Sequence, residues 1–193
     1  MTLSLLAILL GVGMGLPQLV GVTQPAKLAA AARKFPRNLP AGIVLMLLGT
    51  AWFAWNVHVE TLADFEPLKK YMIPGFIAVG VGSCIFVQDF LAVRGLAVVV
   101  LLLGKLMVDT GRPHLPTGIF HVLPGESSWV LVIQAWAYVC IVAGIWFTVT
   151  PWRLRDIINW ATASEARTRL LSGLRLAFAL LVLTLGLTAF RAM

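Results

Sequence analysis

Six long apolar runs are the feature of this chain that most constrains its fold. A helix needs about 20 consecutive apolar residues to cross the hydrocarbon core of a bilayer, and six segments approach or reach that length. They cover residues 3–22, 39–57, 71–87, 93–108, 129–149 and 170–190. Because 60% of the 193 residues are hydrophobic and only 12% are charged, the chain lacks the polar surface of a soluble domain. The sequence predicts an all-α polytopic membrane protein with six transmembrane helices, forming one transmembrane domain over residues 1–193.

The two central runs are the shortest of the six. The third run contains Pro74 and Gly75, and the fourth carries Lys105 near its end. Proline and glycine weaken helices, and a charged side chain is costly inside the bilayer. We therefore expect this central pair to be short, and to be tilted or partly re-entrant.

Lysine and arginine are distributed unevenly between the loops. The first, third and fifth loops contain nine, namely Lys27, Arg33, Lys34, Arg37, Arg94, Arg153, Arg155, Arg167 and Arg169. The other loops and the C-terminus contain four, namely Lys69, Lys70, Arg112 and Arg191. Because cytoplasmic loops are enriched in these residues, both termini are predicted on the outer, periplasmic side of a bacterial-type inner membrane. This topology, with anionic lipids at the cytoplasmic face, explains the net charge of +7 without a nucleic-acid partner.

A sequence pattern recurs in the first and last pairs of runs. Pro25 and Pro151 each follow an apolar run and precede a basic stretch, and in both cases an arginine and then a glycine open the next run. We interpret the chain as three tandem helical hairpins over residues 1–57, 71–108 and 129–190, an internal repeat about the membrane normal. The alternative is that any hairpin with a cytoplasmic turn needs a proline stop and basic residues.

The two long cytoplasmic linkers have the spacing of amphipathic helices that lie in the membrane plane. Apolar residues recur at helical intervals within residues 28–35 and 154–161, beside basic side chains. The interfacial anchors that we expect are Lys27, Arg33, Lys34, Trp152, Arg153, Arg155 and Trp160. Each linker is either a docking site for a partner or a membrane-hugging loop without one.

The terminal hairpins allow a comparison with a known family. Over residues 3–57 and 130–190, each has a helix, a proline, a basic linker and a glycine-containing second helix. This arrangement, carried by Pro25, Pro151 and the linker arginines, resembles the small two-helix bacterial inner-membrane proteins of the YjeT type. The central hairpin departs from the pattern. The resemblance implies an accessory membrane subunit and names no catalytic residue.

Polar residues gather at the end of the fourth run and in the outer loop over residues 109–128. The candidate cluster consists of Lys105, Asp109, Arg112, His114 and His121. Lys105 and Asp109 are four residues apart and share a helical face, where they can form an ion pair. Alternatively, Lys105 simply extends its ammonium group to the headgroups. The loop exceeds the usual length of a connection, and we expect it to be an ordered element on the outer face.

The spacing of Lys105 and Arg112-Pro113 resembles the first signature of the membrane phosphatidic-acid phosphatase superfamily, whose lysine and arginine hold a phosphate. The second signature is broken, because Pro116-Thr117-Gly118 stands where Pro-Ser-Gly-His is required and His121 is displaced. No histidine follows His121 in the sequence to act as the nucleophile. A degenerate phosphatase-like enzyme is accordingly our third interpretation.

The sequence contains no haem or zinc ligand set and no glycine-rich phosphate loop, and Cys84 and Cys140 lack metal-ligand spacing. We therefore expect neither a metal nor a cofactor. The favoured function is an accessory or scaffold subunit without catalytic activity, bound to another membrane protein or to a second copy of the chain. The alternative is a small-solute or ion transporter or channel, for which Asp89, Arg94 and Arg175 are candidate coupling charges. For Asp89 and Arg94, which lie at the predicted central turn, solvated capping is the favoured role.

Overall fold

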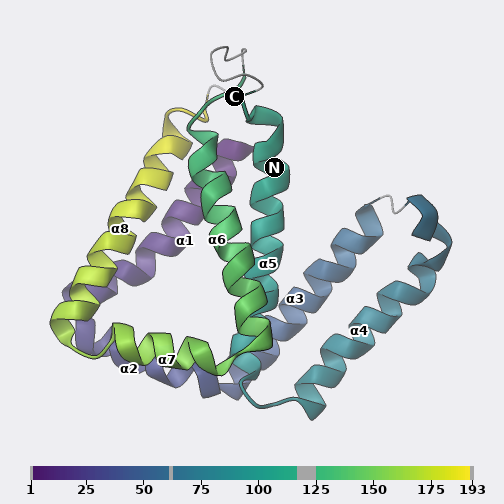
Figure 1. Cartoon of the computed structure of the whole chain (residues 1–193), viewed down its shortest axis with the longest axis horizontal. Helices are drawn as coiled ribbons and strands as arrows, with labels where there is room; N and C mark the ends of the chain where they lie inside the picture. Colours follow the sequence, from purple (N-terminus) through teal and green to yellow (C-terminus); the bar gives the residue numbers. More distant parts are fainter. Residues whose placement is uncertain (1, 61–62, 117–124, 192–193) are drawn as a thin grey trace. The chain divides into compact units, whose positions relative to one another are not determined.

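The computed structural model describes residues 2–60, 63–116 and 125–191, which form helices joined by turns and contain no strand (Figure 1). Six of these helices are long and apolar enough to cross a membrane. They are α1 (Leu3–Thr23), α3 (Leu39–Val59), α4 (Lys69–Phe86), α5 (Leu91–Gly111), α6 (Val130–Val149) and α8 (Glu165–Leu187). The predicted all-α polytopic fold is confirmed, and the chain is a multi-pass membrane protein.

Both long linkers that the sequence predicts to be amphipathic are helical, as their spacing predicts. The first is α2 (Pro25–Lys34) and the second is α7 (Trp152–Ala161). Proline suits the first position of α2, because its missing amide proton is not needed there. The chain turns sharply between α7 and α8 (Figure 1), and Ser164 begins α8 by accepting a hydrogen bond from the Arg167 amide at 3.2 Å.

The central pair of spans is longer than the sequence suggested. The predicted span at residues 93–108 extends in the structure to the 21 residues of α5, and α4 has 18 residues and passes through Pro74 without ending. Within α5, Lys105 meets an opposite charge one turn further along the same helix.

The chain folds into two compact units. Unit 1 consists of Met1–Arg33, Gly104–Cys140 and Ile157–Met193, and unit 2 consists of Lys34–Leu103 and Ile141–Asp156. The chain crosses between them within α2, α5, α6 and α7. The single transmembrane domain and the threefold hairpin repeat stay predictions.

In unit 1, the first and last spans pack side by side and antiparallel (Figure 1). Gly11 faces Leu183, and a Cβ atom built on Gly11 would lie 2.8 Å from the Leu183 Cβ atom. At the opposite end of α1, a Cβ atom on Gly21 would lie 2.1 Å from the Ser172 hydroxyl. These glycines let the two backbones approach closely, as is common between membrane helices. The Ser4 hydroxyl also donates to the Gly186 carbonyl at 2.7 Å, so both chain ends lie at the same end of unit 1.

In unit 2, α3 contacts both α4 and α5. A Cβ atom on Gly42 of α3 would lie 2.6 Å from the Ala92 amide nitrogen at the start of α5. On the other contact, a Cβ atom on Gly80 of α4 would lie 2.0 Å from the Thr50 hydroxyl of α3. Small residues therefore set the distance between helices in both units.

Candidate functional site

The predicted pair at the end of α5 forms. Lys105 Nζ donates to Asp109 Oδ2 and makes an ion pair with it across one helical turn. The two side chains are 40% and 50% exposed, so neither is enclosed by the protein. The pair lowers the net charge of this helix end near the bilayer. It also places a carboxylate on the ammonium group that the phosphatase-like interpretation assigns to a phosphate.

His114 ties together the two described ends of the outer loop. Its ring lies in the short helical turn η3 (Arg112–His114), and Nδ1 donates to the Gly125 carbonyl at 2.9 Å. The Ser127 amide donates back to the His114 carbonyl at 3.1 Å. Gly125 has φ of +90°, a conformation that favours glycine. The base of the loop is therefore fixed, whereas residues 117–124, including His121, lie outside the described residues.

Arg112 is the member of the candidate cluster with an available cationic group. Its side chain is exposed and makes no hydrogen bond or ion pair within the ranges that the structure describes. It begins η3, directly after the end of α5. Among the described members of the candidate cluster, Lys105 and Asp109 thus form an ion pair, His114 fixes the two ends of the loop, and Arg112 has an available guanidinium group.

Gln134 is a structural residue of this region that the sequence analysis missed. It is 5% exposed in α6, and its Nε2 atom donates to the Val108 carbonyl near the end of α5 at 3.2 Å. A Cβ atom on Gly111 would lie 2.4 Å from the same nitrogen, so glycine makes room for the amide. The available signal was a lone amide in an otherwise apolar span.

A second polar centre joins the two linker helices within unit 1. Arg33 of α2 donates from Nε to the Thr162 hydroxyl at 2.9 Å and from Nη2 to the Thr162 carbonyl at 2.5 Å. Arg167 donates from Nη1 to the Trp160 carbonyl at 3.1 Å, and its guanidinium group lies 5.2 Å from the centre of the Trp160 ring. Two cations therefore satisfy carbonyls at the C-terminal end of α7, where the helix dipole is negative.

The predicted interfacial anchors divide into bound and available side chains. Arg33 and Trp160 belong to the polar centre just described, and Arg155 binds Asp156 at 3.0 Å. The side chains of the other anchors are exposed and make no polar contact within the described part of the chain. They are Lys27, Lys34, Trp152 and Arg153.

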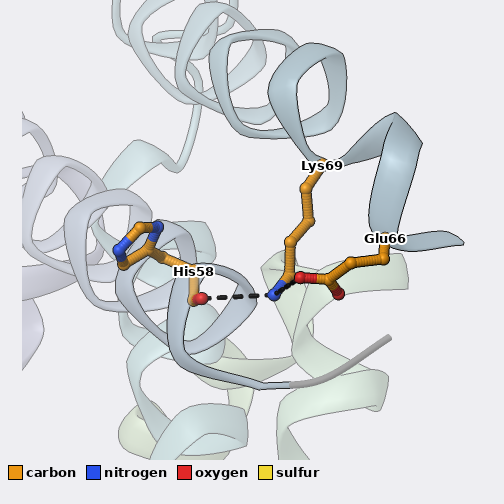
Figure 2. A network of polar contacts seen from close by, with 3 residues as sticks. All are labelled: His58, Glu66 and Lys69. Atoms are coloured by element: carbon orange, nitrogen blue, oxygen red, sulfur yellow. Dashed lines mark hydrogen bonds and ion pairs between the residues drawn. The ribbon is translucent and has the colours of Figure 1, made fainter. Parts of the chain in front are cut away.

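A polar network closes the turn between α3 and α4 in unit 2. Lys69 Nζ donates to the His58 carbonyl at 3.2 Å and pairs with Glu66 Oε1 at 3.1 Å. Figure 2 shows that the His58 imidazole points away from this carbonyl, so the ring takes no part in the network. His58 and Lys69 therefore serve to hold the turn.

Among the described residues, no group of three or more histidine, cysteine and acidic side chains is arranged to hold a metal ion. Cys84 and Cys140 are both free thiols. Comparison of the chain with known protein families, characterised proteins and solved structures gives no match. The resemblance to the YjeT-type proteins therefore stays a prediction.

Proposed function

We propose that this chain is an accessory or scaffold subunit, without catalytic activity, of a bacterial-type inner membrane, and that α4 binds a transmembrane helix of another membrane protein. The observation that carries the proposal is the division of the α4 glycines between two opposite faces. One face packs against α3, and the other is open and contains small residues.

The inner face of α4 is occupied by its neighbour in unit 2. Gly80 receives the Thr50 side chain of α3, as described above. Four residues earlier, and hence on the same face, Phe76 packs edge-on against Phe53 with 4.8 Å between the ring centres. Gly80 and Phe76 on this face therefore both contact side chains of α3.

The outer face of α4 contains Gly75, Ala78 and Gly82, which share one side because they are separated by three and four residues. In the described structure, no atom lies within 4 Å of a Cβ position at Gly75, and at Gly82 only Phe86 of the same helix does. Bulkier residues suffice for a face that meets only lipid, and glycine weakens a helix. Small residues at these spacings instead favour the close approach of a second helix.

The exposure of α4 agrees with this interpretation. Only 6% of its most apolar window is buried in the described structure, against 22–44% in the other five spans. α4 is thus the span with the most surface available to a partner. The favoured occupant is a helix of a different membrane protein, and a second copy of this chain is the alternative.

The proposal includes the orientation of the chain. The first, third and fifth loops lie in the cytoplasm, and both termini lie in the periplasm. The linker helices α2 and α7 contact anionic lipids, and the chain has no nucleic-acid partner. Two observations support this orientation. The lysine and arginine residues of the loops are divided nine to four between the two sides. The side chains of Lys27, Lys34 and Arg153 have no polar partner in the described part of the chain.

A cross-linking experiment tests the proposal. Cys84 and Cys140 are replaced by alanine, and a single cysteine is placed at Ala78, on the outer face of α4. The matched control is Gly13→Cys, because Gly13 is also an open helical glycine, in α1. Cross-linking in native membranes is expected to give one product of defined larger mass from Ala78→Cys and none from Gly13→Cys.

The second arm of the experiment asks whether the small residues matter. Gly82→Leu, combined with Ala78→Cys, is expected to abolish the product because leucine prevents close approach of the helices. A product containing a different protein in fixed stoichiometry supports the accessory subunit, whereas a product of twice the monomer mass supports the second copy. Absence of any product from Ala78→Cys contradicts the proposal.

The transporter alternative has one observation in its favour. The Nε atom of Arg94, in the first turn of α5, is buried without a hydrogen-bond partner among the described residues. An unsatisfied buried donor costs about 1–3 kcal/mol, and a solute or ion-coupled group is one way to satisfy it. Reconstituted proteoliposomes carrying pH- and potential-sensitive dyes test this function. A flux that Arg94→Gln abolishes would favour a transporter over a scaffold.

A further inference from the structure

The start of α8 carries a groove on its exposed face. The groove has a volume of about 520 Å³ and is lined by Ala166, Arg169, Leu170, Gly173 and Leu174. These residues are spaced three and four apart and therefore form one face of the helix. The volume lies within the range of about 300–1,000 Å³ that is common for small-ligand pockets.

Gly173 forms the floor of the groove. No described atom lies within 4 Å of the position that a Cβ atom on Gly173 would occupy. The walls are Leu170 and Leu174, whose side chains are 64% and 62% exposed. The middle of the groove is therefore an apolar depression that opens outward from α8.

Arg169 supplies a cationic group at one end of the groove. Its side chain is exposed and has no hydrogen bond or ion pair in the part of the chain that the structure describes. Arg167, two residues earlier, differs because it already binds the Trp160 carbonyl. The guanidinium group of Arg169 is thus available for a ligand.

We propose that this groove binds one anionic phospholipid, with the phosphate at Arg169 and the upper part of an acyl chain over Gly173. Arg169 is the last basic residue before the predicted span at residues 170–190, which places it at the level of the headgroups. Leu170, Gly173 and Leu174 then face the first part of the acyl region. The order of cation and apolar floor along α8 matches the order of phosphate and hydrocarbon along the lipid.

Guanidinium chemistry favours a phosphodiester in this position. Arginine presents a planar set of donors that matches phosphate oxygens and can donate two parallel hydrogen bonds. Arg175, further along α8, does not line the groove. The site therefore binds the lipid through one cation and one apolar depression, and it does not depend on the partner proposed for α4.

Native mass spectrometry of the full chain in mild detergent tests this site. The probes are phosphatidylglycerol and phosphatidylcholine with identical acyl chains, and glycerol phosphate serves as a soluble competitor. The wild-type chain is expected to retain one phosphatidylglycerol in preference to phosphatidylcholine. Glycerol phosphate should not displace it, because the acyl chain contributes to binding.

Two variants separate the contributions of the groove. Arg169→Gln removes the cation and is expected to lower retention of phosphatidylglycerol about tenfold or more, as for loss of one charged hydrogen bond. Gly173→Leu fills the floor with a side chain and is expected to lower retention because the acyl chain loses its place. The matched controls are Gly13→Leu, at an open glycine of α1, and Arg153→Gln, at an exposed arginine of α7 without a polar partner in the described structure. Both controls should retain the lipid as the wild type does.

Several results would overturn the site. Equal losses from Arg169→Gln and Arg153→Gln would indicate diffuse attraction to the basic surface, and equal retention of the two lipids would remove the role of the phosphate. If Gly173→Leu instead breaks a complex with another protein and leaves lipid retention intact, the groove is a helix-docking site. If Gly173→Leu fails to fold, Arg169→Lys provides the test. Lysine keeps the positive charge but lacks the paired donors, so lipid retention should fall only in part. Gly82→Leu tests α4 separately and should leave lipid retention unchanged.

Discussion

Arg33 holds Thr162 through two hydrogen bonds, although 129 residues separate them in the chain. One bond satisfies the Thr162 hydroxyl and the other its carbonyl, just beyond the end of α7. The two amphipathic linkers are therefore joined directly within unit 1. Arg33, which the sequence analysis predicts at the membrane interface, therefore also connects two helices.

Arg33→Ala should therefore lower the stability of the protein. We expect a loss of about 1–2 kcal/mol, at the low end for hydrogen bonds to a charged group because Arg33 is exposed. Lys34→Ala, at an exposed neighbour without a polar partner in the described structure, should leave stability unchanged. Thermal unfolding in detergent, followed by fluorescence, compares the two. Equal effects of the two substitutions would show that only net charge matters.

The sequence predicted the features that depend on neighbouring residues. The six spans and the helical linkers follow from hydropathy and spacing, and the ion pair of Lys105 with Asp109 follows from their positions on one helical face. The contact of Arg33 with Thr162 joins residues far apart in the chain, and such a contact depends on how the helices pack. The same holds for Gln134, whose partner carbonyl belongs to a different helix.

The packing of α1 against α8 gives a second prediction. Gly11→Ala should destabilise the protein by about 1–3 kcal/mol, because the new methyl group would lie 2.8 Å from the Leu183 Cβ atom and 2.9 Å from the Ala179 carbonyl. Gly13→Ala, where no described atom lies within 4 Å, should be neutral or slightly stabilising because alanine favours helix. The thermal midpoints of the two purified variants provide the measurement. The packing described for unit 1 is wrong if Gly11→Ala is tolerated as well as Gly13→Ala.

The ion pair at the end of α5 gives a third prediction. Lys105→Met and Asp109→Asn should show a coupling energy of about 0.5 kcal/mol in a double-mutant cycle, the usual value for a partly exposed pair one helical turn apart. The free energies of unfolding of the wild type, both single variants and the double variant complete the cycle. A coupling energy of zero would favour the alternative in which Lys105 only extends to the headgroups.

The fourth prediction concerns orientation in the membrane. Six spans place both termini on one side, and the division of loop bases favours the periplasm for them. Single cysteines at Thr2 and Lys34, in a chain whose Cys84 and Cys140 are replaced by alanine, report on the two sides because both positions are exposed. A membrane-impermeant thiol reagent added to intact cells should label Thr2→Cys and leave Lys34→Cys unlabelled until the membrane is disrupted. Labelling of Lys34→Cys alone would contradict the predicted orientation and place Arg169, with its groove on α8, at the outer headgroups. The cytoplasmic role of α2 and α7 would then be wrong. The lipid site would not, because phosphodiester headgroups occur on both sides of the membrane.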